Sequence, residues 1–405
     1  MGYTKSAIIG VSWLGAARAA TRFGSLIRTA ILARLLTPAQ FGIFGMAALV
    51  LAFLEIMVET GVNVVLIQEK DDVKEFINTA WVISIIRGIM ISILIILSTP
   101  LVILFFKTSE LTGYILLISM VPFIRGFINP AIVNFQKDLK FHLEFKFRTA
   151  IFFVDATVAI IITLITMTPV GLIWGLIAGA LAEVVISQLF VKPRPRFKLD
   201  SKKAKTIVGR GKWMTLAGIF NYFSSQGDDA VVGRIMDSTA LGLYQVAYKI
   251  STLPLTEVTQ LINKVTLPVY VRISDDKKRL RRAFVRTMIA ITLIVVPISL
   301  VIYLFPNFVI NILLGSKWSA AVPVLKVLAV FGVIRALIGV PHSLFLSLKK
   351  QRVVAISMLL ETIGLAIFIV PMVNRYGIVG AANATILSTF LNFPYLLYKL
   401  DKEFS

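Results

Sequence analysis

Nine of the 42 Lys and Arg residues in this chain lie within stretches that are otherwise apolar enough to cross a membrane. They are Arg18, Arg22, Arg28, Arg87, Arg125, Lys249, Lys264, Lys326 and Arg335. A basic side chain at the centre of a spanning helix costs ~2.5–3.5 kcal/mol on insertion scales. We therefore expect these residues to have either acidic partners inside the protein or an anionic cargo.

The first apolar stretch carries the densest group of embedded charges. Arg18 and Arg22 are one helical turn apart and share a face, and Arg28 lies beside that face. A guanidinium fork binds phosphate oxygens bidentately and stays charged, so this face is suited to a phosphate-bearing cargo. The alternative is a structural role, in which Arg18 and Arg22 pair with Glu55 and Glu59 of the next helix.

The matching stretch of the second half is polar and acidic instead. Its polar face consists of Asn221, Ser224, Ser225 and Asp228, with Asp229 adjoining it. Embedded acids of this kind can carry protons or bind Na⁺. Asp228 occupies the position equivalent to Arg28, which predicts a pair that acts as a gate, or else a static ion pair.

Two further arginines, Arg125 and Arg335, lie near the centres of later stretches. For both we favour structural pairing, with Asp155, Glu183 and Glu361 as the available partners.

The composition is that of an integral membrane protein. Hydrophobic residues make up 57% of the 405 residues, and the mean hydropathy is +0.86. Cys is absent, which excludes disulfides and thiolate metal sites, and no metal site is expected. Stretches of about 20 apolar residues can span the hydrocarbon core. Twelve spans are predicted, at residues 8–34, 42–66, 77–106, 112–134, 147–168, 170–191, 213–236, 241–268, 284–306, 318–348, 353–374 and 377–398.

The remaining Lys and Arg residues are divided unevenly between the two ends of these spans. Twenty-eight fall at the N-terminus and in the even-numbered connections, and five fall on the opposite side. The positive-inside rule then places both termini in the cytoplasm. Most of the net charge of +21 is thus an orientation signal beside anionic lipid, and nucleic acid is not an expected partner.

The chain contains an internal repeat. At an offset of 200 residues, eight identities fall between residues 13 and 47, among them Trp13 with Trp213 and Gly42 with Gly242. The polar, Pro-bearing linker at about 192–212 separates two predicted lobes, 1–200 and 201–405. We therefore predict an all-α fold of about 12 transmembrane helices. They form two six-helix bundles related by a pseudo-two-fold axis along the membrane normal, a design found in transporters.

Several stretches resemble the polysaccharide-transport family of lipid-linked oligosaccharide flippases, within the multidrug/oligosaccharidyl-lipid/polysaccharide exporter superfamily. The resemblance is clearest in ILARLLTPAQFGIFGMA (31–47), NYFSSQGDDAVVGRIMDSTALGLYQVAYKI (221–250), LPLTEVTQLINKVTLPVYVRISDDKKRLRRAF (253–284) and LLGSKWSAAVPVLKVLAV (313–330). It covers nearly the whole chain, although many members of the family have fourteen helices.

The resemblance implies a flippase rather than an enzyme. Its cargo would be a polyprenyl-(pyro)phosphate-linked oligosaccharide, moved from the cytoplasmic to the outer leaflet of a prokaryotic inner membrane by alternating access. It would act with membrane lipids and polysaccharide-assembly proteins, without a cofactor, and with H⁺ or Na⁺ as coupling ions. The expected cargo-binding residues are Arg18, Arg22, Arg28, Asn221, Tyr222, Ser224, Ser225 and Lys249. The expected gating or ion-coupling residues are Glu55, Glu59, Asp228, Asp229 and Glu257.

Three other functions stay open at this point. A cation-coupled drug antiporter of the same superfamily usually carries cations, and the arginine-rich first helix argues against it. A polysaccharide polymerase or ligase would need a sizeable outward loop, and the predicted outward loops are short. A passive lipid scramblase is the third.

Overall fold

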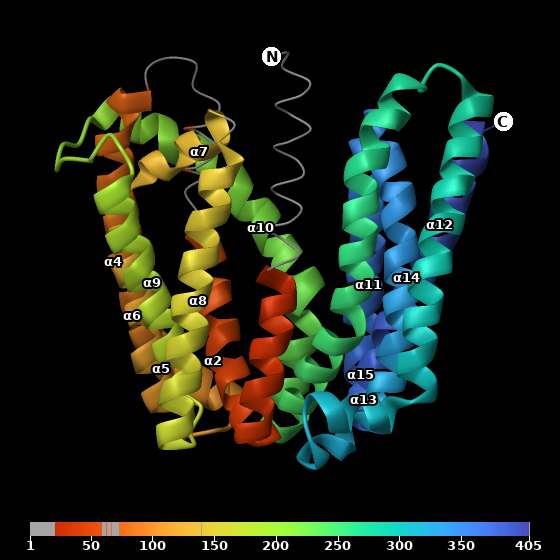
Figure 1. The fold of residues 1–405 in the computed structure, drawn as a ribbon, viewed down its shortest axis with the longest axis horizontal. Helices are drawn as coiled ribbons and strands as arrows, with labels where there is room; N and C mark the ends of the chain where they lie inside the picture. Colours follow the sequence, from red (N-terminus) through yellow and green to blue (C-terminus); the bar gives the residue numbers. More distant parts are fainter. Residues whose placement is uncertain (1–20, 59–61, 63–65, 67–72, 139, 405) are drawn as a thin grey trace. The chain divides into compact units, whose positions relative to one another are not determined.

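The computed structural model describes residues 21–404 apart from 59–61, 63–65, 67–72 and 139 (Figure 1). Among these residues nearly all the secondary structure is helical, and none of it is strand. The chain forms two compact units. The first comprises Met1–Leu36 and Ile43–Tyr222, and the second comprises Thr37–Gly42 and Phe223–Ser405. The division at Tyr222/Phe223 falls within a helix, and the lobe boundary at 200/201 stays a prediction.

The internal repeat is visible in the backbone. The helix of residues 21–35 is followed by α2 (Pro38–Met57), and α10 (Ser201–Ile235) is followed by α11 (Ser238–Arg272), so both hairpins turn at equivalent positions. Thr37 accepts a bond from the Gln40 backbone amide at 3.4 Å, and Asp237 accepts one from the Ala240 amide at 2.7 Å. Side chains at equivalent positions thus cap α2 and α11.

The next four predicted spans, all in the first unit, also correspond to helices, but one of these is broken. The elements are α4 (Val73–Phe106), α5 (Leu111–Ile118), α6 (Met120–Arg125), η1 (Pro130–Val133), α7 (Asn134–Lys137), α8 (Phe141–Thr166) and α9 (Val170–Phe190). The stretch predicted as one span at 112–134 bends by 71° between Arg125 and Pro130. Asn129 stabilises the bend, because its side chain accepts from the Ala131 amide and donates to the Val191 carbonyl.

Small residues bring α8 and α9 close together. Gly171, Gly175 and Gly179 recur every fourth residue along α9 and face α8. A methyl group on Gly175 would lie 2.6 Å from the Asp155 carboxylate. This packing is typical of membrane helices, where close approach takes the place of a hydrophobic driving force.

The second unit is built around α14 (Val322–Ser347), which packs against α11, α12 (Lys277–Leu304) and α15 (Gln351–Phe404). Two short elements, α13 (Pro306–Leu313) and η2 (Ser316–Ala321), join α12 to α14. Gly377 adopts φ +59° inside α15 and divides it into two helices. These correspond to the predicted spans 353–374 and 377–398, and glycine takes this left-handed conformation at no steric cost.

The predicted linker is shorter than expected. Only residues 191–200 are non-helical, because Asp200 caps α10 and the helix begins at Ser201. The Asp200 carboxylate accepts from the Lys202 and Lys203 amides at 2.9 and 3.2 Å. Hydrogen bonding from the Lys203 amide, then from Lys202, lowers the pKa of this partly exposed carboxyl below its usual value.

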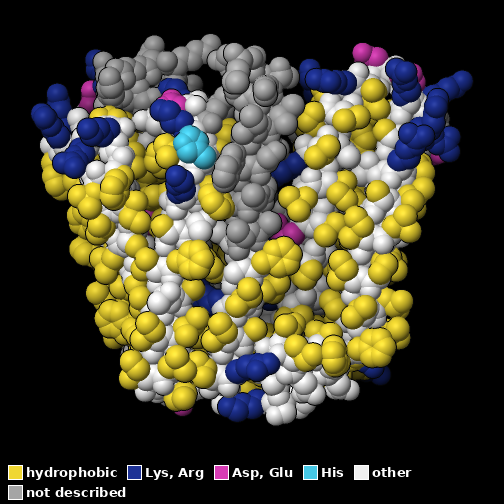
Figure 2. Space-filling view, in the orientation of Figure 1, with side chains coloured by type: hydrophobic (Ala, Val, Ile, Leu, Met, Phe, Trp, Pro, Cys, Tyr) yellow, Lys and Arg dark blue, Asp and Glu magenta, His cyan; other side chains and the backbone are white. Residues whose placement is uncertain are grey.

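The described chain is a multi-pass membrane protein. Seven of its helices are long and apolar enough to cross a bilayer, and the bent pair Leu111–Arg125 with Pro130–Lys137 adds an eighth candidate span. Figure 2 shows hydrophobic side chains over the middle of the helices and Lys and Arg gathered towards their ends. The predicted spans 213–236 and 241–268 correspond to α10 and α11, which are not among the seven. These are the helices that carry Asp228, Asp229 and Lys249.

Candidate functional site

Arg28 is held by an ion pair inside the first unit. Its NH1 donates to Asp155 Oδ2 on α8 at 2.8 Å, and both side chains are largely buried, at 16% and 15% exposed. Nε and NH2 of Arg28 are buried and make no hydrogen bond to any described residue. Arg28 therefore has an acidic partner and keeps donors that could serve an anion.

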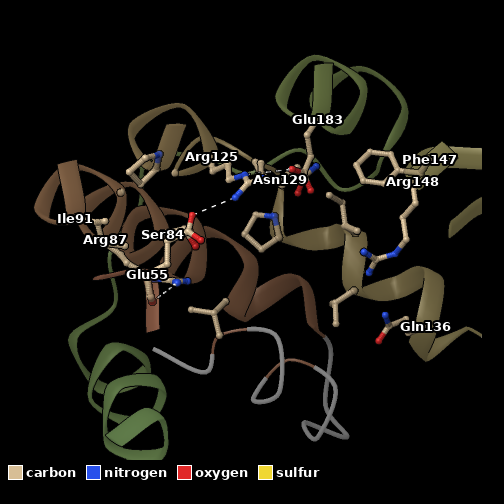
Figure 3. Close-up of a pocket in the computed structure, with 18 of the residues that line it drawn as sticks. Glu55, Ser84, Arg87, Ile91, Arg125, Asn129, Gln136, Phe147, Arg148 and Glu183 are labelled. Atoms are coloured by element: carbon tan, nitrogen blue, oxygen red, sulfur yellow. Dashed lines mark hydrogen bonds and ion pairs between the residues drawn. The ribbon is translucent and has the colours of Figure 1, made fainter. Parts of the chain in front are cut away.

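A polar cavity of about 460 Å³ lies in the same unit, between α2, α4, α6, η1, α8 and α9 (Figure 3). Arg125 lies between two of its carboxylates, with NH1 3.1 Å from Glu55 and Nε 3.9 Å from Glu183. Arg87 donates to the backbone carbonyl of Glu55 at 3.1 Å. Arg125 thus lies beside Glu183, one of the partners considered for it, and it also contacts Glu55. A pairing of Glu55 with Arg18 or Arg22 was the structural alternative for those arginines, and it stays a prediction.

The same cavity contains a second ion pair. Glu144 is buried and accepts from Arg148 Nε at 2.8 Å and from Gln136 Nε2 at 2.9 Å. The lining thus holds three arginines and three glutamates. Charges balanced in this way suit water, a polar neutral group or a zwitterion better than a bare anion, because an anion would have to displace a carboxylate from its arginine.

The predicted cargo ligands of the first half are only partly described. Arg18 and Glu59 lie outside the described residues. Arg22 lies on the helix of residues 21–35 and its side chain is exposed. Tyr222, which we expected to bind cargo, is 6% exposed, and its hydroxyl donates to the Leu49 carbonyl at 2.9 Å. This gives Tyr222 a packing role within the first unit, and its cargo contact stays a prediction.

A second cluster of charged and aromatic residues lies in the second unit. Asp228 is buried and accepts from the Tyr244 hydroxyl at 2.7 Å, and Asp229 accepts from Gln245 Nε2 at 3.1 Å. Tyr248 continues the cluster one turn along α11, where its ring lies 6.0 Å from that of Tyr244. Each predicted acid of α10 therefore has a polar partner on α11.

Arg335 joins this cluster from α14. It donates to the Tyr248 hydroxyl, and its guanidinium lies 6.0 Å from the Tyr248 ring and 5.8 Å from the Phe331 ring. The pairing of Arg335 with a carboxylate stays a prediction, and its contacts with the aromatic rings of Tyr248 and Phe331 had not been predicted.

The other predicted residues of the second half do not form one cluster. Ser224 accepts from the Thr362 hydroxyl at 2.9 Å, and Asn221 is exposed. Ser225, Lys249 and Glu257 are each partly exposed. Arg28 and Asp228 belong to different units, and the gate between them stays a prediction.

Sequence reasoning missed Tyr244 and Gln245 as partners of the two aspartates. The sequence did contain a signal for these contacts, because the turn of the α10–α11 hairpin lies at 236–237. Residues 228 and 244 are equally far from residue 236, so antiparallel helices bring them together. Gln136 and Glu144 were also missed, since the bend that brings η1 and α7 to α8 has no equivalent in the predicted straight span.

The fold and these clusters define a polytopic α-helical membrane protein with clusters of charged residues between its helices. A family model described as "Polysaccharide biosynthesis protein" matches residues 31–323, and the chain belongs to this family. It is 24% identical over 356 residues to the teichuronic acid biosynthesis protein TuaB of Bacillus subtilis (strain 168), covering 85% of this chain and 72% of TuaB. It is 22% identical over 388 residues to the lipopolysaccharide biosynthesis protein WzxC of Escherichia coli (strain K12), covering 95% of this chain and 78% of WzxC.

A solved structure shows the same fold. The inward closed conformation of the lipid II flippase MurJ superimposes with a TM-score of 0.77 at 17% identity, covering 96% of this chain and 88% of that chain. The predicted all-α membrane fold and the family resemblance are therefore confirmed.

Proposed function

We propose that this protein is a flippase for a polyprenyl-(pyro)phosphate-linked oligosaccharide and that it serves the synthesis of a cell-surface polysaccharide. Three observations support the proposal: the match to the polysaccharide biosynthesis family, the relatives named for teichuronic acid and lipopolysaccharide synthesis, and the flippase fold. The observation that carries it is the presence of arginines inside the spanning helices of a chain from this family.

The chemistry of such a cargo matches what these residues can offer. The polyprenyl tail stays in the bilayer, so the protein has to solvate only the phosphate and the sugars. Arg22 and Arg28 supply guanidinium donors on the first helix, and two nitrogens of Arg28 are not used by described residues. Asn221 and Ser225 supply hydrogen-bonding groups for sugar hydroxyls.

Movement from the cytoplasmic to the outer leaflet by alternating access is part of the proposal, with both termini in the cytoplasm. The excess of Lys and Arg in the even-numbered connections supports this orientation. Asp228 and Asp229 are candidates for coupling to H⁺ or Na⁺, because adjacent acids within a spanning helix are costly unless they serve a function. On this proposal the protein has no catalytic residue.

Reconstitution tests the proposal directly. Purified protein is placed in vesicles that carry a fluorescent polyprenyl-pyrophosphate oligosaccharide, and an impermeant quencher reports the fraction of label in the outer leaflet. We expect protein-dependent translocation of this lipid and none of a labelled phosphatidylcholine. Equal movement of both lipids would indicate a scramblase, and efflux of a cationic dye without lipid movement would indicate a drug antiporter.

A further inference from the structure

A basic surface covers the first turns of α12 in the second unit. Lys278, Arg281, Arg282 and Arg286 line a shallow hollow of about 490 Å³ together with Val285. All five side chains are exposed. Figure 2 shows Lys and Arg side chains gathered at the end of the molecule where Figure 1 places the α11–α12 turn. We call these five residues the α12 basic face.

The packing of α12 fixes this face outwards. Leu280, Phe284 and Ile291 are buried on the opposite side of the helix, in a core shared with α11 and α14. Asp276 caps the helix by accepting from the Arg279 amide at 2.9 Å, which holds the first turn in place. The basic residues therefore cannot turn inwards to find partners without unpacking α12.

The face has no acidic partners in the described part of the chain. None of its four basic side chains makes an ion pair with a described residue, and the nearby Asp276 is paired with Arg279. Like charges at i, i+4 spacing repel each other and destabilise a helix. Arg282 and Lys278 have this spacing, as do Arg286 and Arg282, so the repulsion between them destabilises the isolated helix.

The repeat shows that the fold does not require this cluster. The third helix of the first half, α4, begins in the sequence DDVKEF, where acids outnumber the single lysine. A positive-inside signal alone would need no such concentration on one helix face, since other connections already supply it. The cluster therefore calls for a separate explanation.

Below the basic residues the same face of α12 becomes apolar. Ile289, Leu293 and Val296 follow at helical spacing and are exposed, Leu293 to 70%. The α12 basic face thus joins a strip suited to an acyl chain. A cationic surface that continues into a strip of exposed apolar side chains matches a phospholipid with an anionic headgroup.

We propose that the α12 basic face binds the headgroup of an anionic phospholipid in the cytoplasmic leaflet, with an acyl chain along Ile289, Leu293 and Val296. Three arginines supply paired N–H donors for the phosphate oxygens. We assign the surface to bilayer phospholipid rather than to the transported lipid because it lies on the side of α12 opposite the helices that carry Tyr248 and Arg335. The proposal does not depend on the flippase assignment.

Native mass spectrometry of the purified full chain tests it, with phosphatidylglycerol as the probe and phosphatidylcholine as the reference lipid. The test variant combines Arg281→Gln, Arg282→Gln and Arg286→Gln. The matched control removes three exposed charges elsewhere on the cytoplasmic side, by Lys198→Gln, Lys202→Gln and Lys205→Gln. We expect the test variant to lose phosphatidylglycerol affinity by about tenfold or more, and the control by less than about twofold.

Three outcomes would overturn the proposal. One is unchanged phosphatidylglycerol binding in the test variant. Another is an equal loss in the control, which would show that only the total charge matters. The third comes from a polyprenyl pyrophosphate added as a second probe: loss of its binding, with phosphatidylglycerol binding intact, would assign the face to the transported lipid. Size-exclusion chromatography and thermal unfolding confirm that each variant is folded.

Discussion

Gly42 of α2 and Gly242 of α11 occupy equivalent positions of the internal repeat, and each packs against the backbone of the other's helix. A methyl group on Gly42 would lie 1.6 Å from the Ser238 carbonyl oxygen, and one on Gly242 would lie 2.0 Å from the Pro38 carbonyl oxygen. Real side-chain carbons do not approach backbone atoms this closely. The two helices therefore cross near their N-termini at a contact that only glycine permits.

Substitution at this crossing is expected to separate the two helix ends. Gly42→Ala and Gly242→Ala should each destabilise the protein by about 1–3 kcal/mol, because the obstacle is backbone and cannot rotate away. Thermal unfolding in detergent measures the change, and translocation in vesicles should fall with it. Gly227→Ala on α10 is the control, since a methyl group there has no heavy atom within 4 Å. Equal stability of all three variants would contradict the close crossing.

The predicted orientation can be tested because the chain contains no Cys. Single cysteines are introduced at Ser109, between α4 and α5, and at Ser201, at the start of α10. Both positions are exposed. The charge distribution predicts that an impermeant thiol reagent added to intact cells labels Ser109→Cys and leaves Ser201→Cys unlabelled until the membrane is opened. The reverse labelling would invert the topology and with it the direction of transport.

Arg28 has a structural role if it pairs permanently with Asp155, and a gating role if it pairs with Asp228 in one transport state. Removal of one member of a buried ion pair costs about 3–5 kcal/mol, so Arg28→Ala should destabilise the first unit strongly. Arg28→Met combined with Asp155→Leu should recover much of that stability, because no buried charge is left without its partner. A double-mutant cycle on unfolding should show coupling between Arg28 and Asp155.

A second double-mutant cycle, of Arg28 with Asp228 and measured on transport rate, tests the gate between these two residues. A pair that forms in one transport state biases the equilibrium by its differential energy, so the exchange Arg28→Asp with Asp228→Arg should restore part of the lost rate. The exchange is compared with each single variant at matched expression. If the effects of the two single variants add and the exchange restores no transport, there is no gate between Arg28 and Asp228. Pairing with Asp155 would then be the role of Arg28.

Hydropathy and charge predicted much of the fold but few of the contacts between charged side chains. A helix lies at each of the predicted spans, as far as they are described, because apolar stretches of spanning length have few other conformations in a bilayer. The break in the span 112–134 was not predicted, since it depends on Asn129 bonding to backbone groups of α9 and the residues after it. The contact of Glu55 with Arg125 was not predicted for a related reason: helix spacing defines a face but not which neighbour packs against it, and Arg125 ends the helix that precedes that bend.

The last prediction concerns Arg22, the described arginine on the face proposed to bind the cargo phosphate. Its side chain is exposed within the unit, so Arg22→Ala should leave thermal stability within about 0.5 kcal/mol of the native chain. Transport should fall by about tenfold or more, because a hydrogen bond to a charged group contributes about 1.5–3 kcal/mol. Arg22→Lys should restore only part of the rate, since lysine keeps the charge but lacks the bidentate fork. Lys317→Ala removes a comparable exposed charge outside this face and should transport normally. Normal transport by Arg22→Ala, or loss of folding in that variant, would show that Arg22 is not a ligand of the cargo.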